Sequence, residues 1–114
     1  MKPEFEEHHS SATELALLCP KCRTSALHHG AVEVFVRKCE DSNQGMHTTV
    51  AESLEPRTDF DMRLNPSARR DGVLIHLHCE NGCGNFVLAI VQHKGNTHLK
   101  IGTVAPQISW GRDA

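Results

Sequence analysis

Four cysteines of the chain stand in two close pairs whose spacing is typical of a metal site. Cys19-Pro-Lys-Cys22 has two residues between its sulfurs, and Cys79-Glu-Asn-Gly-Cys83 has three. At either spacing, one turn of the backbone can direct two thiolates at a single ion. Four soft ligands in tetrahedral geometry favour zinc over magnesium or calcium and leave iron as the main competitor. The pattern therefore predicts one structural Zn²⁺ held by Cys19, Cys22, Cys79 and Cys83.

Other ligand sets remain open. His76 and His78 stand close to Cys79, but in a strand they share the face opposite to it, which makes them poor partners for the same ion. Cys39 could replace one ligand, although it stands alone on an expected strand, where a small apolar core residue is the more common role. A redox-active pair would open a helix in a βαβ unit, and the sequence has no such helical pattern. The odd count of five cysteines also argues against a fully paired disulfide framework.

The ligand set bears directly on catalysis. A zinc ion with four cysteine ligands has no open position for a water molecule, so we expect a non-catalytic protein without a small-molecule substrate. The alternative is a metalloenzyme in which His76 or His78 replaces a cysteine and a water completes the coordination.

The residues that must position the cysteine turns read as strands. Gly72–Cys79 and Asn85–His93 flank the second turn and are rich in valine, isoleucine and leucine, which makes them the strongest strand predictions. Further strands are expected at Thr13–Leu18, Ala31–Cys39, Met46–Leu54 and Thr97–Val104. Asn65–Gly72 is a predicted loop, and His28-His29 a predicted bend near the first cysteine turn. The fold class is therefore mostly β, with a small antiparallel sheet.

The length of 114 residues gives room for one modest core. We expect a single β domain over residues 13–105, which contains both cysteine turns. An acidic and polar N-terminal tail is expected over residues 1–12, and a C-terminal tail over residues 106–114.

Several stretches of the chain match a known kind of protein. They are Leu18-Cys-Pro-Lys-Cys22, Leu27–Arg37, Glu40-Asp-Ser42, Asn65–Gly72, Cys79-Glu80 and Gln92–Thr97. From about Leu18 to Leu99, the chain resembles short, uncharacterised zinc-ribbon proteins of bacteria and their mobile elements. The resemblance implies a rubredoxin-like zinc ribbon, in which two hairpin knuckles clasp one zinc, and it implies no established activity.

Basic and aromatic residues outside the cysteine turns are candidates for a contact surface. Arg69 and Arg70 stand in the predicted loop, where guanidinium groups could bind phosphate or carboxylate. Lys94 stands in a predicted hairpin turn. His76 and His78 are expected on one strand face, in a row that continues through the next strands toward His93, His98 and Lys100. Trp110, near the C-terminus, could anchor a partner.

We therefore expect a module that contacts nucleic acid or a nucleic-acid-handling protein. Total charge gives no support for this, because 12 lysines and arginines face 14 aspartates and glutamates. The nucleic-acid element rests on the general use of zinc ribbons. The alternative is a protein-interaction adaptor or inhibitor encoded by a mobile element, without nucleic-acid binding.

The N-terminus carries no apolar signal core, and no apolar run approaches the roughly 20 residues that span a bilayer. We therefore expect no membrane partner. A soluble, cytoplasmic bacterial protein is the expectation, and close cysteine pairs in that reducing compartment are more often metal ligands than disulfides.

Overall fold

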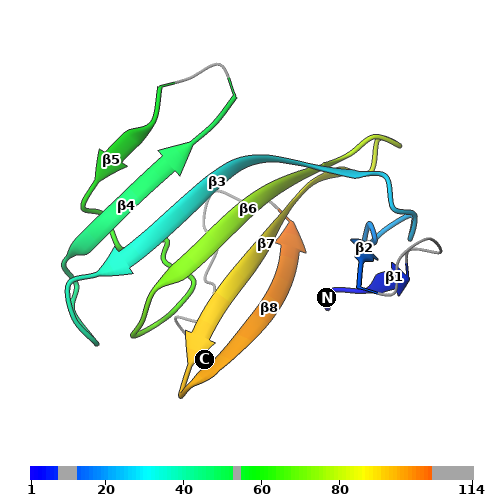
Figure 1. Cartoon of the computed structure of the whole chain (residues 1–114). Helices are drawn as coiled ribbons and strands as arrows, with labels where there is room; N and C mark the ends of the chain where they lie inside the picture. The colour runs from blue at the N-terminus through cyan, green and yellow to red at the C-terminus, as the bar shows by residue number, and fades with distance from the viewer. Residues whose placement is uncertain (8–12, 53–54, 104–114) are drawn as a thin grey trace.

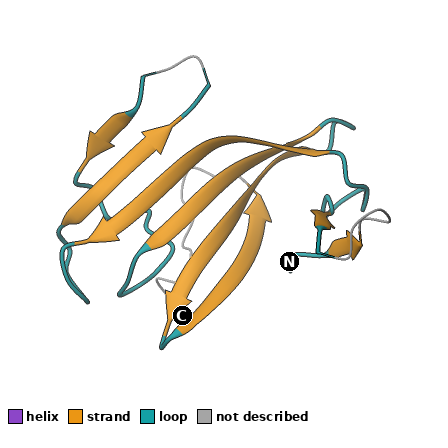
Figure 2. Cartoon of the chain, viewed as in Figure 1, coloured by secondary structure: helices purple, strands orange, loops and turns teal. Residues whose placement is uncertain are grey.

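A computed structural model describes residues 1–7, 13–52 and 55–103 of the chain. All regular elements in these ranges are β-strands, as expected, and they form two antiparallel sheets (Figures 1 and 2). Their bounds are β1 Phe5–Glu7, β2 Leu15–Leu17, β3 Leu27–Arg37, β4 Gly45–Val50, β5 Arg57–Asp59, β6 Gly72–Cys79, β7 Gly84–His93 and β8 Asn96–Thr103.

The main sheet has six strands in the order β5-β4-β3-β6-β7-β8. Strands β6, β7 and β8 form a meander, and the predicted turn between β7 and β8 is confirmed. Lys94 and Gly95 both have positive φ, 47° and 81°, between the paired residues His93 and Asn96. Two residues of this conformation give the turn type whose twist matches that of paired strands.

One face of the main sheet is covered by the segment over residues 60–71, which connects β5 to β6. Met62 of this segment belongs to a buried cluster with Phe35, Leu74, Val87, Ala89 and Val91. Asn65 and Ser67 are also fully buried. The predicted loop at Asn65–Gly72 is therefore confirmed as a loop, but it packs on the sheet instead of standing in solvent.

A second core lies at the end of the main sheet where β6 turns into β7. It consists of buried Cys19, Leu77, Cys79, Phe86 and Ile101. The two-stranded sheet of β1 and β2 lies beside this end of the main sheet (Figure 1). Leu17 of β2 packs against the cluster, so the small sheet is attached through the cysteine region.

The structure differs from the sequence expectations at three places. His28 and His29 do not form a bend, because they pair with His78 and Leu77 as part of the 11-residue strand β3. The irregularity falls just after them, between His29 and Val32. Within the segment expected as an N-terminal tail, Phe5–Glu7 pairs with β2. Arg57–Asp59 forms an edge strand on β4, where no strand was expected.

In the described part of the chain, no helix is long and apolar enough to cross a membrane.

Candidate metal centre and contact surfaces

The two cysteine pairs meet in space. Cys19, Cys22, Cys79 and Cys83 bring their sulfurs within 4.8 Å of one another, and this set could hold a metal ion. Cys19 and Cys79 are buried, whereas Cys22 and Cys83 are partly exposed. Cys39 lies outside the set and is exposed beyond the end of β3, so the expectation of an apolar core residue on a strand was wrong. His76 and His78 do not join the set either. The predicted face assignment is therefore confirmed for these histidines.

A tight backbone turn positions the sulfurs of each cysteine pair. In the first turn, the Arg23 amide donates to the Cys19 carbonyl at 2.9 Å, and Arg23 takes a φ of 59°. In the second, the Gly82 amide donates to the Cys79 carbonyl at 3.2 Å, and Gly82 has a φ of 81°. The Glu80 amide joins the two halves by donating to the carbonyl of Ala26 at 2.9 Å.

The surroundings of the sulfurs differ between the two partly exposed cysteines. Hydrogen bonds from Thr24, and then from Asn81, lower the pKa of Cys22 to about 5. The Thr24 hydroxyl lies 3.1 Å from this sulfur and the Asn81 amide 3.6 Å from it. Desolvation, followed by hydrogen bonding with Cys79, raises the pKa of Cys83 to about 12. Crowded sulfurs cannot all ionise without a neutralising cation, and a metal ion would supply that charge.

Arg69, Arg70 and Lys94 lie around one pocket on the face of the main sheet that the 60–71 segment covers. The pocket has a volume of about 370 Å³. The other charged or titratable residues that line it are Glu40, His93, His98 and Lys100. The rings of His93 and His98 approach to 6.3 Å between centroids. We call this site the basic pocket.

Acidic side chains partly neutralise the two arginines of the basic pocket. Arg69 donates to Asp41, with Nε 2.5 Å from Oδ1, and to Glu40 at 2.9 Å. Arg70 lies 3.1 Å from the other oxygen of Glu40. The hydrogen bond with Asp41 raises the pKa of Arg69 and lowers that of Asp41. A ligand phosphate would therefore compete with Glu40 for both guanidinium groups.

The expected row of histidines is interrupted. His76 and His78 pair with Val87 and Asn85, whereas His98 pairs with Val91 at the other end of β7. His76 and His78 are therefore absent from the basic pocket. The Nδ1 of His78 lies 3.0 Å from Oδ1 of Asn85. The prediction of one continuous imidazole row was wrong because the register of β6 on β7 could not be known from one sequence.

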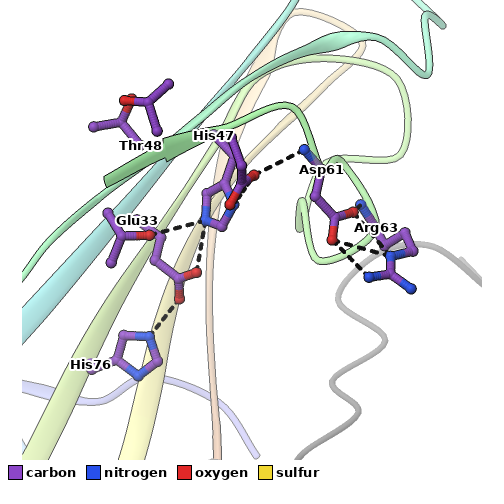
Figure 3. A network of polar contacts seen from close by, with 9 residues as sticks. Glu33, His47, Thr48, Asp61, Arg63 and His76 are labelled. Carbon is purple, nitrogen blue, oxygen red and sulfur yellow. Dashed lines mark hydrogen bonds and ion pairs between the residues drawn. The ribbon is translucent and has the colours of Figure 1, made fainter. Parts of the chain in front are cut away.

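His76 instead belongs to a polar network that spans four adjacent strands (Figure 3). Its Nε2 lies 2.6 Å from Oε2 of Glu33, and the other oxygen of Glu33 lies 2.8 Å from Nε2 of His47. The second nitrogen of His47 lies 2.9 Å from Asp59. His47 is also stacked on Phe35, with 4.2 Å between ring centroids. The hydrogen bond from His76 lowers the pKa of Glu33.

The sequence interpretation missed this network. A signal existed, because Glu33 interrupts the apolar run Val32–Val36, and a carboxylate on the covered side of a strand needs a partner. The partners come from β4 and β6, however, and only the strand register identifies them. Every nitrogen and oxygen of the Glu33 and His47 side chains contacts another side chain in the network, which indicates a structural role.

The sequence also gave no indication of the structural role of Arg37. Its guanidinium donates to the backbone carbonyls of Ser42, Ser67, Ala68 and Arg70 at 2.5 to 3.2 Å. Arg37 therefore holds the covering segment, and with it the arginines of the basic pocket, against the end of β3.

Trp110, the predicted aromatic anchor, lies outside the described residues. In comparisons with known proteins, no family model, curated protein or solved structure matches the chain.

Proposed function

We propose that the protein is a non-catalytic zinc-binding module that contacts nucleic acid through the basic pocket. The observation that carries the metal part is the cluster of four cysteine sulfurs within 4.8 Å. Zinc with sulfur ligands at about 2.3 Å in tetrahedral geometry places these ligands about 3.8 Å apart. The sulfurs of Cys22 and Cys79 lie 3.7 Å apart, which matches this requirement.

A structural role for the zinc follows from the ligand set. All four positions of a tetrahedral ion are filled by protein, so none is left for a catalytic water. The cysteine sulfurs also join the two-stranded sheet to the main sheet, where a cross-link has most effect on folding. As in a zinc ribbon, two backbone turns would then clasp one ion.

Metal content and ligand identity test this part directly. Purified protein is expected to contain one zinc per chain, and a cobalt-substituted sample to show the absorption of a four-sulfur site. Iron as the resident metal, or a cobalt spectrum with nitrogen ligands, would contradict the zinc assignment or the ligand set respectively.

The nucleic-acid part is supported by the composition of the basic pocket. Two arginines and two lysines converge there, and Glu40 is the single acidic residue among those that line it. Phosphate groups are bound mainly by such cations, and the release of counterions makes the affinity depend on salt.

Binding to labelled single-stranded and double-stranded DNA and RNA across a salt series is the test. Lys94→Ala is expected to reduce the slope of log K against log salt by about 1, because one phosphate contact is lost. Arg63→Ala is the matched control, since Arg63 is exposed and lies outside the basic pocket. Glu40→Gln is expected to strengthen binding, because it removes the acidic partner of Arg70 and one of the two acidic partners of Arg69. An absence of salt-dependent binding to all four nucleic acids would rule out this part of the proposal and leave the zinc part intact.

A further inference from the structure

The second face of the main sheet has an unusual composition. The segment over residues 60–71 covers one face, and the cysteine turns cover the other face only at the β6–β7 end. The rest of this second face presents apolar side chains from five strands. They are Val32, Val34 and Val36 of β3, Met46 and Val50 of β4, Val73 and Ile75 of β6, Leu88 and Ile90 of β7, and Leu99 of β8. We call this surface the open apolar face.

Strand register establishes that these residues share one side of the sheet. Val34 pairs with Val73, and Val73 pairs with Ile90, which in turn pairs with Leu99. On the other side of β3, Val36 pairs with Met46. Directly paired residues point to the same side of a sheet, and neighbours along a strand alternate. The row therefore crosses the sheet from β4 to β8.

Five of these ten side chains are exposed, and the other five are partly buried. Val34 is 39% exposed, Val36 45%, Met46 50%, Val50 51% and Leu99 43%. Isolated apolar residues on a surface are normal, but a contiguous apolar patch of this width marks an interaction surface. The strand sequences agree, because strands that are apolar on both sides are normally covered on both sides.

The charge of the open apolar face indicates which kind of partner fits it. Along the described strands from β4 to β8, no aspartate, glutamate, lysine or arginine shares this side of the sheet. At one edge of the face, charged residues of both signs line a pocket together with Val73 and Ile90; they are Arg37, Glu40, Arg69, Arg70 and Asp71. At the β4–β5 margin the polar residues are neutral, such as Thr48 and Thr58, whose hydroxyls lie 3.1 Å apart. An uncharged surface is complementary to itself under a two-fold axis, because no like charges meet.

We propose that two copies of this chain pack their open apolar faces together as a β-sandwich dimer. Two sheets pack face to face about 10 Å apart, with interdigitated side chains at the centre. A stable interface buries about 800 Å² on each partner. The ten apolar side chains of the open apolar face, on five strands, would form the centre of such an interface. The histidines and Lys100 of the basic pocket lie on the opposite side of the sheet, whereas Arg69 and Arg70 lie at the edge, where they also line a pocket with Val73 and Ile90 of the open apolar face.

The oligomeric state in solution tests this proposal. Sedimentation velocity of the metal-loaded full chain from about 1 to 100 µM is expected to show a species of twice the chain mass of 12.6 kDa. Val34→Lys and Leu99→Lys are expected to weaken association at least tenfold, because each places a charge inside an apolar interface. His98→Lys is the matched control, since His98 precedes Leu99 on β8 and faces the opposite side.

A further variant separates loss of association from loss of fold. Thr48→Lys adds charge at the face without removing any apolar side chain, and circular dichroism with metal content verifies that each variant is folded. A wild-type monomer over the whole concentration range would overturn the proposal, as would dimers unaffected by the three face variants. A monomer in which residues 104–114 cross-link to the open apolar face would assign that face to this segment instead. Raised salt is expected to preserve the dimer, in contrast to nucleic-acid binding.

Discussion

The sulfurs of Cys22 and Cys79 lie 3.7 Å apart, although 57 positions separate the two residues in the chain. Between them the chain forms β3, β4, β5 and β6, which are four of the six strands of the main sheet. The cysteine cluster is therefore a long-range connection that encloses half of the fold. Its disruption affects the whole domain and not only a local turn.

Loss of one cluster sulfur is expected to abolish metal binding and to lower the melting temperature. Cys79→Ser removes a buried sulfur of the cluster, and loss of the proposed structural zinc would lower Tm by more than about 10 °C, because such an ion contributes folding free energy. Chelation of the wild-type protein should give a similar loss. Thermal unfolding together with metal analysis measures both effects. Cys39→Ser, at an exposed position outside the cluster, is the control, and an equal effect there would contradict the ligand assignment.

The Glu33 network is expected to make the free energy of unfolding depend on pH in the acidic range. The hydrogen bond from His76 holds the pKa of Glu33 below its ordinary value of 4.5. Since the folded pKa is the lower one, this carboxylate stabilises the fold above about pH 4.5, and the contribution disappears as the pH falls through the folded pKa.

Glu33→Gln is accordingly expected to destabilise the protein near neutral pH by about 1.5 to 3 kcal/mol, because the hydrogen bonds to a charged acceptor are lost. The difference from wild type should shrink below pH 4.5. Urea unfolding across a pH series measures this, with Glu55→Gln at an exposed position as control. A difference that stays constant with pH would mean that the charge of Glu33 is irrelevant.

Arg37 is expected to be essential for the covering segment. Arg37→Lys keeps a charge but cannot reproduce the fork that reaches the carbonyls of Ser67, Ala68 and Arg70. We expect a loss of about 2 to 3 kcal/mol in the free energy of unfolding and faster amide exchange in residues 65–71. Arg57→Lys, on an exposed edge strand, is the control. Unchanged exchange in the segment would show that other contacts hold it.

Substitution of two glycines in the described chain tests how tightly the segment over residues 60–71 packs on the sheet. A Cβ added at Gly72 would lie 2.5 Å from Oδ1 of Asn65 and 2.7 Å from Cγ of Pro66. One added at Gly30 meets nothing closer than a carbonyl at 3.9 Å. Gly72→Ala is therefore expected to cost about 1 to 3 kcal/mol, and Gly30→Ala less than about 1 kcal/mol. Equal losses of unfolding free energy for the two variants in denaturant titrations would show that the 60–71 segment shifts at little cost to make room for the added methyl group.

The sequence predicted the elements whose evidence is local. Gly72–Cys79 and the Lys94-Gly95 turn carry their own pattern of residues, and both are confirmed. The cysteine spacing likewise identified the four residues that the fold brings together, because ligand geometry restricts each pair to a short turn. The β-branched residues of Ala31–Cys39 were enough to predict a strand, although its bounds are Leu27–Arg37.

Features that depend on register could not be predicted. Glu33 meets His47 and His76 only because β3 lies between β4 and β6, and a shift by one residue would send every side chain to the opposite face. The pairing of Arg69 and Arg70 with Glu40 and Asp41 joins segments about 30 positions apart for the same reason. Long-range pairing is a property of the whole sheet, and no local pattern encodes it.

The wide separation of the cysteine pairs also has a consequence for biosynthesis. Cys19 and Cys22 leave the ribosome well before Cys79 and Cys83. At about 5 to 20 residues per second, the interval of 57 positions between Cys22 and Cys79 lasts roughly 3 to 11 s. During that time, the nascent chain presents two thiols with half of a coordination sphere. The set of four is complete only when Cys83 has emerged, so the proposed ion would be held by all four sulfurs no earlier than that point.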